Sequence, residues 1–579
     1  MFQNGLCSFF LKNIHLTKKK KSICDRIVSE VTSMYYFIGI KGSGMAPLAT
    51  ILYELGNEVA GSDIDKYIFI EDELRKRNIP IYSFNKDNIK DGYHVIIGNA
   101  FDESNEEVKA ALENPNVKCT RYYDFLADFM EHYVSIAVAG THGKTTTTGM
   151  AYHLFEDFDK TSVLIGDGTG HGQVGSKYFI SETCEFQDHF LHYHPDYAII
   201  NNIELDHVDY FGNLERYIQS FEQFAKQVKK TVIVWGDDPN IKKIHFEKHV
   251  LRFGLGENND VRAVNVLETP QGLSFDVYIH QELFGHFNIP LFGMHMLYNS
   301  LAIITLGYLE DMSYDYILSK LQTFKGTKRR YTVKTQGNNV FVDDYAHHPT
   351  AIRYVIEATR VRYPGKKIVA IFQPDRFSRG ARFAKEFAQE MDKADYPYFC
   401  PFPENAKHED GIDIDIYDIS KNSARAKVIT EDEAGVKELM QYDNCVFLFM
   451  SSKDIYKFEE MLIEAKNIKR VNCGTIIEES RGMFMTTMDI CYCVLILAGA
   501  FCLVALGVLF IRTSTAIKQT GDTVEMAQDT LKRVDKILDD VNYKLDLLNA
   551  PVETVAKFFD PQRPKFNPLK MMMSFIKKK

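Results

Sequence analysis

A glycine-rich stretch ending in lysine and threonines has the residue types of a phosphate-binding loop. Residues 138–147 read Val-Ala-Gly-Thr-His-Gly-Lys-Thr-Thr-Thr, after an apolar run at 134–139 and before a helix-permissive segment. Glycines let backbone N–H groups turn toward phosphate oxygens, the lysine can neutralise the β- and γ-phosphates, and a threonine hydroxyl suits Mg²⁺. Val138 stands where the strict P-loop pattern has its first glycine. The stretch still predicts an ATP site rather than a plain turn, made of Gly140, Thr141, His142, Gly143, Lys144, Thr145 and Thr146.

Acid, imidazole and amide side chains follow the loop at the ends of later elements. Glu182 comes after a strand-like run at 178–180, and His207 comes after another at 197–200. At one edge of a sheet, a carboxylate and an imidazole could hold a metal ion against the transferred phosphate. His295 and Asn299 are four residues apart on a predicted helix, so both can reach one ligand. Each is weak evidence alone, and together they form a site hypothesis.

A basic cluster at 325–330, which ends in Arg330, marks a predicted domain junction. Polar residues follow a strand-like run soon after it, namely Asp344, Tyr345, His347 and His348. The runs at 366–372 and 446–450 read as further buried strands. A third α/β domain is therefore predicted from 331 to about 469.

These side chains need elements to position them, and the earliest predicted element is a strand at 35–38 that enters a second glycine turn. Gly42, Ser43 and Gly44 form the turn before a helix at 46–55, which is a geometry that brings backbone amides to a diphosphate. Ser62 and Asp63, after the next strand, are expected to meet a ribose or the turn itself. A strand and loop at 95–101, with Asn99, is placed at the same sheet edge, where ligands bind in such folds.

Bulk composition sets limits on function. The chain has 579 residues, of which 45% are hydrophobic and 25% charged, which suits a globular protein of three or four domains. A net charge of −10 argues against nucleic acid as the main partner. The ten cysteines are scattered without a Cys-x-x-Cys pair, so neither a disulfide framework nor a zinc site is predicted, and the chemistry is expected to be cytoplasmic.

The order of these motifs resembles the Mur ligases over about 34–469. The motifs are Gly-Ile-Lys-Gly-Ser-Gly-Met, Gly-Asn-Ala-Phe, Gly-Thr-His-Gly-Lys-Thr, Glu-x-Cys-Glu-Phe, Asn-x-x-x-Asp-His, His-x-x-x-Asn, Arg-Arg and Asp-Asp-Tyr-Ala-His-His-Pro-Thr. The ATP loop is typical of the whole family. The first and the last motif are most similar to the members that join L-alanine to UDP-N-acetylmuramate in peptidoglycan precursor synthesis.

The resemblance implies a three-domain α/β enzyme. Its parts would be a Rossmann-like UDP-sugar domain (34–132), a P-loop-type ATP-binding domain (133–327) and a Rossmann-like amino-acid-binding domain (328–469). The substrate carboxylate would attack ATP to give an acyl phosphate, and the amine of alanine would displace phosphate. Lys144, Glu182, His207 and Arg330 would be catalytic, with Thr145 and Glu182 on one Mg²⁺ and His207 on a second. His295 and Asn299 would bind the nucleotide; Gly42, Ser43, Gly44, Ser62, Asp63 and Asn99 the UDP sugar; and Asp344, Tyr345, His347 and His348 the amino acid.

Two positions depart from the usual pattern of the family. Asp375 stands where a histidine is common, and Ser451-Ser452-Lys453 replaces a small Gly-Ala-Gly run. Both lie in the predicted amino-acid domain, so they put the choice of amino acid in doubt and leave the ATP site untouched. A related ligase that adds another amino acid or a recycled murein peptide is the alternative. A membrane-anchored interaction protein with a decayed ligase part is a third reading.

The carboxy-terminal part has a different character. Residues 490–511 carry no charge and are long enough to span a bilayer, so a transmembrane helix is predicted at 489–512 after a linker at 470–488. Apolar residues spaced by three and four within 517–552 predict a helical, coiled-coil-like tail (513–579) that packs against a partner helix. This part resembles small single-span membrane proteins. It is either a tether to the cytoplasmic membrane or a neighbouring reading frame joined to the ligase. At the other end, 1–33 is expected to be a disordered extension, with Met34 as a candidate start.

Overall fold

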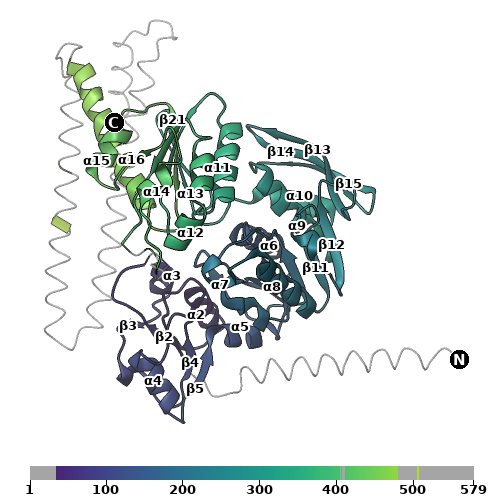
Figure 1. Cartoon of the computed structure of the whole chain (residues 1–579). Coiled ribbons are helices and arrows are strands. Elements are labelled where there is room, and N and C mark those ends of the chain that lie inside the picture. Colours follow the sequence, from purple (N-terminus) through teal and green to yellow (C-terminus); the bar gives the residue numbers. More distant parts are fainter. Residues whose placement is uncertain are drawn as a thin grey trace, which may run out of the picture. The chain divides into compact units, whose positions relative to one another are not determined.

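The computed structural model describes residues 34–68, 70–404, 406, 411–479, 498 and 505–506. The chain divides into two compact units at Asn472, and three β-sheets belong to the first of them. We call the parts that carry these sheets the first domain (35–130), the middle domain (134–323) and the third domain (332–472) (Figure 1).

The first domain holds five parallel strands in the order β3-β2-β1-β4-β5. The strands are short and mostly buried, and helices connect them, as parallel pairing requires. The elements are β1 (Tyr35–Ile38), α2 (Met45–Glu54), β2 (Val59–Ser62), α3 (Glu71–Lys76), β3 (Ile81–Tyr82), η1 (Lys86–Asn88), β4 (His94–Ile97), α4 (Glu106–Glu113), β5 (Lys118–Arg121) and α5 (Tyr122–Met130).

The middle domain holds a ten-stranded sheet in the order β15-β14-β13-β12-β11-β10-β6-β9-β7-β8. Its elements are β6 (Val134–Ala139), α6 (Lys144–Phe155), β7 (Thr161–Leu164), β8 (Gly170–His171), β9 (Tyr178–Glu182), η2 (Phe186–His192), β10 (Tyr197–Ile200), α7 (Val208–Phe211), α8 (Leu214–Gln227), β11 (Thr231–Trp235), η3 (Ile241–Lys243), β12 (His249–Gly254), β13 (Val261–Thr269), β14 (Gly272–Ile279), β15 (Glu282–Ile289), α9 (Met294–Leu309) and α10 (Tyr314–Thr323). Side chains of α8 lie in the core on one face of this sheet, and those of α6, α9 and α10 lie in the core on the other.

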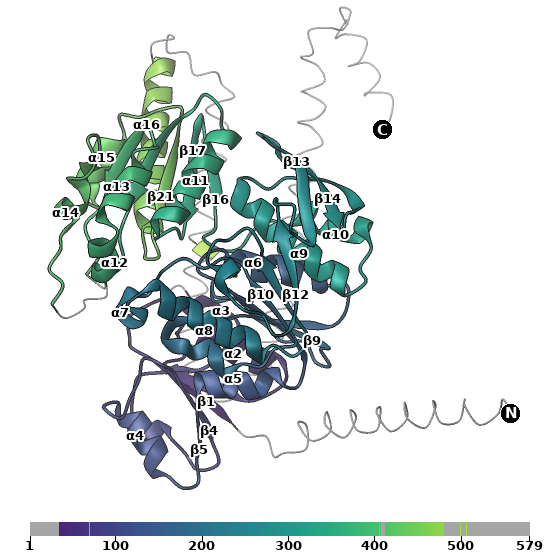
Figure 2. The same cartoon turned by 45° about the vertical axis from the view of Figure 1, so that its right-hand side comes forward.

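The third domain holds six strands in the order β16-β17-β21-β18-β19-β20, parallel except for β16. The elements are β16 (Thr332–Gln336), β17 (Asn339–Asp344), α11 (Pro349–Arg362), β18 (Lys367–Phe372), α12 (Phe377–Arg382), α13 (Ala384–Met391), β19 (Tyr396–Phe399), α14 (Ile416–Ser420), β20 (Lys427–Val428), α15 (Glu433–Leu439), β21 (Cys445–Met450) and α16 (Tyr456–Glu479). Helices α11, α13 and α14 pack on one face, and α15 and α16 on the other (Figure 2).

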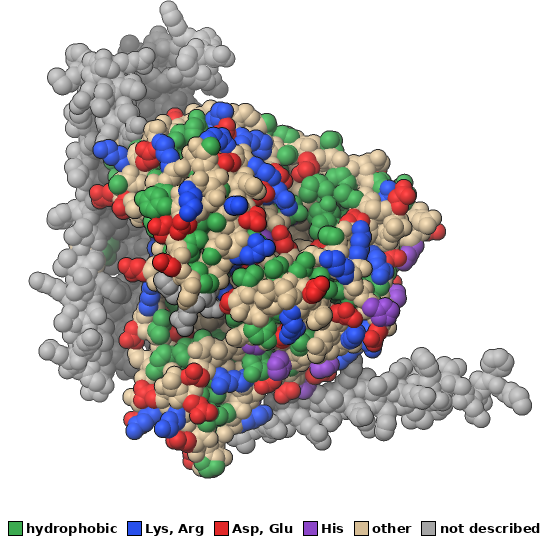
Figure 3. Space-filling view, in the orientation of Figure 1, with side chains coloured by type: hydrophobic (Ala, Val, Ile, Leu, Met, Phe, Trp, Pro, Cys, Tyr) green, Lys and Arg blue, Asp and Glu red, His purple; other side chains and the backbone are tan. Residues whose placement is uncertain are grey.

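The domains of this unit contact one another through helices next to the predicted site. Helix α2 of the first domain packs on β7 and β8 of the middle domain, while α12 and α11 of the third domain meet α7 and α9. Figure 3 shows basic and acidic side chains intermixed over the visible face of the described residues.

The three-domain α/β fold predicted from the sequence is confirmed, and the predicted strands at 134–139, 197–200 and 446–450 are β6, β10 and the end of β21. The antiparallel extension formed by β13, β14 and β15 was not predicted. Its signal is present in the sequence, because Leu273, Phe275, Val277 and Ile279 alternate with less buried residues along β14.

The carboxy-terminal predictions fall almost entirely on residues that the structure does not describe. Of the predicted span at 490–511 only residues 498, 505 and 506 are described, and the extension at 1–33 and the tail at 513–579, with its partner-binding segment 517–552, lie outside the described residues. Within the described part of the chain, no helix is both long enough and apolar enough to cross a bilayer.

Candidate active site

The phosphate loop predicted from the sequence joins β6 to α6, as expected. Gly140 (φ 129°) and Gly143 (φ 82°) both adopt backbone angles that disfavour other residues. A Cβ atom on Gly143 would lie 2.9 Å from Oδ1 of Asn299, so the loop also needs glycine for space. The end of β10 supports the loop, because Asn202 Oδ1 accepts a hydrogen bond from the backbone N–H of His142 at 2.8 Å. Asn299, on α9, therefore lies against the loop, as its prediction as a nucleotide-binding residue requires.

Lys144 begins α6, and its ammonium group is held by acidic and carbonyl oxygens. Its Nζ donates to the carbonyl of Thr141 at 3.3 Å and lies 3.0 Å from Oε2 of Glu185. Burial, the largest single influence, lowers the pKa of Lys144, but Glu185, Cys184 and Glu182 together outweigh it and raise the pKa above its ordinary value. Lys144 is thus a fixed cation at the mouth of the loop. Glu185 was not predicted as a site residue, although it belongs to the Glu-x-Cys-Glu-Phe motif.

The predicted metal ligands Thr145 and Glu182 are brought together. The Thr145 hydroxyl donates to Oε1 of Glu182 at 3.1 Å, and the backbone N–H of Gly166 donates to the other carboxylate oxygen at 2.8 Å. Burial raises the pKa of Glu182, against the opposing charges of Lys144 and Arg330. A hydroxyl and a carboxylate oxygen side by side, beside a phosphate loop, are the donor set that Mg²⁺ prefers, so these residues fit the ion.

His207, predicted to hold a second Mg²⁺, lies beside Glu185. Its Nε2 is 3.6 Å from Oε1 of Glu185, and its Nδ1 is buried without a hydrogen-bond partner among the described residues. Burial lowers the pKa of His207, so the imidazole is neutral and has a free lone pair for a metal ion. The Glu185 carboxylate therefore lies between Lys144 and His207, and any second metal position at His207 involves this acid.

Arg330 reaches the middle domain from the junction with the third domain. Its guanidinium donates to the hydroxyl of Thr145 at 3.0 Å and lies 4.7 Å from the ring centre of Tyr345. Arg329 and Tyr331, its neighbours, both have positive φ angles near 54°. Arg329 is anchored by Asp343, with Nε 3.1 Å from Oδ2. The strained, anchored backbone thus points Arg330 at the phosphate loop.

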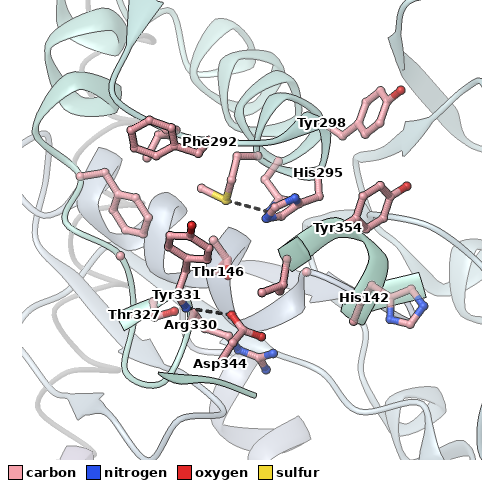
Figure 4. Close-up of a pocket in the computed structure, with 18 of the residues that line it drawn as sticks. His142, Thr146, Phe292, His295, Tyr298, Thr327, Arg330, Tyr331, Asp344 and Tyr354 are labelled. Atoms are coloured by element: carbon pink, nitrogen blue, oxygen red, sulfur yellow. Dashed lines mark hydrogen bonds between the residues drawn. The ribbon is translucent and has the colours of Figure 1, made fainter. Parts of the chain in front are cut away.

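A cavity of about 490 Å³ opens between the phosphate loop and the third domain. Figure 4 shows its aromatic wall, which includes Tyr298, Tyr331 and Tyr354, with His295 above and Asp344 below. The ring of Trp235 lies 4.4 Å from that of Tyr298. Burial lowers the pKa of His295 to about 4, so its imidazole is neutral. The cavity combines aromatic and apolar side chains with polar groups from the loop and from the third domain, as expected for a nucleotide pocket.

The third-domain residues predicted for the amino acid separate into two groups at and after the end of β17. Asp344 faces the cavity and accepts hydrogen bonds from the backbone N–H groups of Tyr331 and Ala346 at 2.8 and 2.7 Å. Burial raises its pKa to about 6. His347 donates from Nδ1 to the carbonyl of Tyr345 at 2.8 Å, and burial lowers its pKa to about 4. Asp344 lies by the nucleotide cavity, whereas His347 lies near Arg379 and Asp375.

A buried ion cluster connects the middle and third domains next to His347. The guanidinium of Arg379, on α12, binds Asp206 of the middle domain at 3.0 Å and Asp375 at 2.7 Å. The hydroxyl of Ser452 donates to the second oxygen of Asp375 at 2.8 Å. Asp375 and Ser452 are the two departures from the usual family pattern, and they contact each other. Arg379 and Asp206 were not predicted, because their partners lie more than 170 positions apart in the chain.

A second cross-domain contact joins the phosphate loop to α11. Oε2 of Glu204 lies 2.8 Å from Nε2 of His142, and Oε1 of Glu204 accepts a hydrogen bond from the hydroxyl of Thr350 at 2.7 Å. His348 lies on the same side, with Nδ1 3.9 Å from Oε2 of Glu204. Sequence reasoning placed His142 and His348 in separate sites, whereas the structure brings them together.

The glycine turn of the first domain is held mainly by contacts with other residues of the same domain. Asp63 accepts a hydrogen bond from the backbone N–H of Lys41 at 2.7 Å, so it binds the turn, one of the two roles expected of it. The Ser62 hydroxyl binds the buried carboxylate of Glu107. Gly44 leaves no room for a side chain, because a Cβ atom would lie 2.4 Å from the hydroxyl of Tyr122. Asn99 meets the middle domain, where its amide contacts His189 Nδ1 at 3.2 Å.

Family models match this chain in three consecutive segments. The Mur ligase family catalytic domain matches residues 34–134, the Mur ligase middle domain matches 138–307, and the Mur ligase glutamate ligase domain matches 329–452. Together these matches cover more than half of the chain.

Solved structures of similar fold span the same part of the chain. UDP-N-acetylmuramate-alanine ligase MurC from Thermotoga maritima is 25% identical, with a TM-score of 0.63 over 75% of this chain and 99% of that chain. A murein peptide ligase from Psychrobacter arcticus is 21% identical, with a TM-score of 0.56 over 75% and 98%. MurF from Thermotoga maritima, solved with ADP, is 18% identical, with a TM-score of 0.50 over 70% and 94%. The family models and the docked phosphate-loop site lead to one conclusion: the chain belongs to the Mur ligases, the ATP-dependent ligases of peptidoglycan synthesis.

Proposed function

We propose that this ligase joins L-alanine to the lactyl carboxylate of UDP-N-acetylmuramate, with conversion of ATP to ADP and phosphate. The observation that carries the proposal is the likeness to the Thermotoga maritima MurC, which extends over 99% of that protein. The motifs around Gly42 and Asp344 also resemble those of alanine-adding members of the family. Because ATP and nucleotide sugars are cytosolic, we place the reaction in the cytoplasm.

We assign the ATP triphosphate to the loop 140–146 and the base to the cavity beside it. The cavity volume of about 490 Å³ lies within the range of small-molecule sites. Tyr298, backed by Trp235, offers an aromatic surface for the base, while His295 and Asn299 offer polar groups. The ADP in the related MurF structure supports a nucleotide in this fold. The UDP sugar is assigned to the turn at Gly42, Ser43 and Gly44 and to Asn99, at the boundary of the first and middle domains.

The first step activates a carboxylate, which is otherwise a poor acylating agent. A carboxylate oxygen of the sugar substrate attacks the γ-phosphorus of ATP, the bond from that phosphorus to the β,γ-bridging oxygen breaks, and ADP leaves. Lys144, in the loop, and Arg330, from the domain junction, stabilise the negative charge on the transferred group. Bound at Thr145 and Glu182, Mg²⁺ would supply further positive charge at the phosphates.

The second step forms the amide bond. The uncharged amine of alanine attacks the acyl carbon, the tetrahedral intermediate releases inorganic phosphate, and the nitrogen loses a proton. We place the amino acid beside His347, where Arg379 and Tyr345 of the third domain face the middle domain. Domain docking keeps water from the acyl phosphate, which would otherwise hydrolyse.

A murein peptide is the second candidate for the amine substrate. The contact between Asp375 and Ser452, at two positions that depart from the family pattern, changes the third-domain surface near His347. The murein peptide ligase of Psychrobacter arcticus supports this alternative by fold. A decayed ligase is disfavoured, because Lys144, Thr145 and Glu182 keep a complete loop geometry.

Phosphate release from ATP by the full-length chain tests the proposal. The protein is supplied with UDP-N-acetylmuramate and, in turn, each amino acid and a murein tripeptide. We expect release that requires both the sugar and L-alanine and that disappears in Lys144→Ala. Lys226→Ala, an exposed lysine on α8, is the matched control and retains activity. Turnover with the tripeptide and none with alanine would replace the alanine assignment, and ATP turnover without either substrate would contradict ligase function.

A further inference from the structure

Three side chains with metal-binding atoms converge where the middle domain meets the third domain. His142 comes from the phosphate loop, Glu204 follows β10, and His348 is the residue before α11. Their ligand atoms all lie within 4.8 Å of one another. Nε2 of His142 and Nδ1 of His348 lie 2.8 and 3.9 Å from the same carboxylate oxygen of Glu204. The proposed Mg²⁺ ligands Thr145, Glu182 and His207 are a separate set.

His348 and Glu204 are buried or hydrogen-bonded in ways that suit metal ligation. His348 is 2% exposed, and its Nε2 is buried without a hydrogen-bond partner among the described residues. Burial lowers the pKa of His348 to about 3, so the ring is neutral. Burial alone would raise the pKa of Glu204, but its hydrogen bond to His142 lowers it to about 2. At neutral pH His348 is therefore a neutral imidazole and Glu204 a carboxylate anion.

Further contacts orient the carboxylate and balance the nearby charges. Thr350 donates to Oε1 of Glu204 at 2.7 Å, which leaves Oε2 directed at the imidazoles. Such an outer hydrogen bond is typical of metal-binding carboxylates. The positive charge of Arg379 nearby is matched by Asp206 and Asp375, so the surroundings do not repel a cation.

We propose that His142, Glu204 and His348 form a binding site for a transition-metal dication, with Zn²⁺ as the preferred ion. Two imidazole nitrogens and one carboxylate oxygen match three-ligand zinc sites and are poor ligands for Mg²⁺. Tetrahedral zinc, with ligand bonds of about 2.0–2.1 Å, places its ligand atoms roughly 3.3 Å apart. Side-chain shifts on the order of 1 Å from the observed separations reach this geometry.

An ion at this position would cross-link the two domains that carry the active site. His142 and Glu204 belong to the middle domain and His348 to the third, so separation of the domains would break a metal bond. Because substrates and products must pass between these domains, Zn²⁺ is expected to slow turnover reversibly. This site goes beyond the proposed function, and binding requires neither ATP nor a sugar substrate.

Cobalt substitution in the full-length protein tests the site directly. Co²⁺ is added without nucleotide and in a large excess of Mg²⁺, which occupies oxygen-rich sites and leaves nitrogen ligands free. We expect visible absorption of tetrahedral Co²⁺ to saturate at one equivalent and to be abolished by Zn²⁺. Glu204→Gln and His348→Ala should each weaken Co²⁺ binding at least tenfold, and Thr350→Val about tenfold. Glu182→Gln, in the proposed Mg²⁺ site, should leave the absorption unchanged.

Hydrogen exchange supplies a second measurement that does not depend on activity. Zn²⁺ should slow amide exchange in α11 of the wild type and leave it unchanged in Glu204→Gln, whose isosteric side chain can keep its contact with Thr350. The proposal is overturned if the tetrahedral signal is absent, if it persists in both Glu204→Gln and His348→Ala, or if Glu182→Gln removes it. Loss of ligase activity alone would bear only on the proposed function, because these titrations contain no substrate.

Discussion

The buried ion cluster of Arg379, Asp206 and Asp375 makes a quantitative prediction about domain docking. The side chains of Arg379 and Asp206 are 5% and 10% exposed, so water screens their charges weakly. Arg379→Met leaves two buried carboxylates without a cation and should destabilise the docked third domain by about 3–5 kcal/mol. Asp206→Asn removes one charge but leaves Arg379 paired with Asp375, and should cost only about 1.5–3 kcal/mol.

The double variant Arg379→Met/Asp206→Asn sharpens this prediction. It leaves a single uncompensated carboxylate, Asp375, so its cost should be smaller than the sum of the two single costs. A coupling of roughly 1–3 kcal/mol is expected for side chains in direct contact. Native-state hydrogen exchange of α12 amides reports the free energy of opening in each variant. Arg382→Met, a 53% exposed arginine on the same helix, is the matched control and should change it by no more than about 0.5 kcal/mol.

The stability that the ion cluster contributes should depend on pH in a defined direction. Burial would raise the pKa values of Asp206 and Asp375, but Arg379 lowers them, that of Asp375 to about 2. Stability from these carboxylates is present above their unfolded pKa of about 3.9 and is lost as pH falls toward 2. In Arg379→Met the buried carboxylates prefer protonation, so the deficit should be smaller at pH 5 than at pH 7. The reasoning is refuted if each variant lowers the free energy of opening by less than about 0.5 kcal/mol, if the two single losses simply add in the double variant, and if neither loss changes with pH.

Three further predictions concern the phosphate loop and the cavity. Gly143→Ala places a Cβ atom against α9 and should abolish ATP binding in equilibrium dialysis. The control Gly56→Ala, also at positive φ but in open space, should lower the free energy of unfolding in urea by about 1 kcal/mol and leave ATP binding intact. Burial raises the pKa of Asp344 to about 6, so the contribution of its protonated form to stability is lost as pH rises from about 4 through 6. Urea unfolding should therefore show that Asp344→Asn gains up to about 3 kcal/mol of stability relative to wild type over that pH interval, and the absence of a gain would contradict the prediction. Trp235 is the single tryptophan and lines the cavity, so its fluorescence should change on ATP binding and not with the UDP sugar alone. An unchanged emission spectrum at saturating ATP would refute the assignment of the adenine base to this cavity.

Local sequence patterns predicted the strand–loop–helix units and the positions of the main loops, while the three-domain fold came from the family resemblance and the β13–β15 extension was missed. The order strand, glycines, Lys144 and helix is contiguous, so β6, the loop and α6 follow from residue types alone. The contact of Thr145 with Glu182 was also predictable, because β6 and β9 are adjacent parallel strands whose ends meet at one edge.

Contacts between domains could not be read from sequence, because nothing local encodes which surface meets which. Asp206 and Arg379 belong to separate elements that only docking brings together, and the same is true of Glu204 and Thr350. Glu185 is a different case, since its pairing with Lys144 depends on the path of the chain after β9. Sequence predicted acids near the loop and left open which acid faces which cation.

The division of the site between two domains has a consequence for how substrate preference can evolve. The groups that we assign to phosphate are nearly all in the middle domain, whereas Asp375 and Ser452 touch each other inside the third. A paired change at those two positions can alter the surface offered to the amine while the nucleotide half keeps its geometry. The architecture therefore allows modular change, in which the surface offered to the amine can vary without altering the nucleotide half.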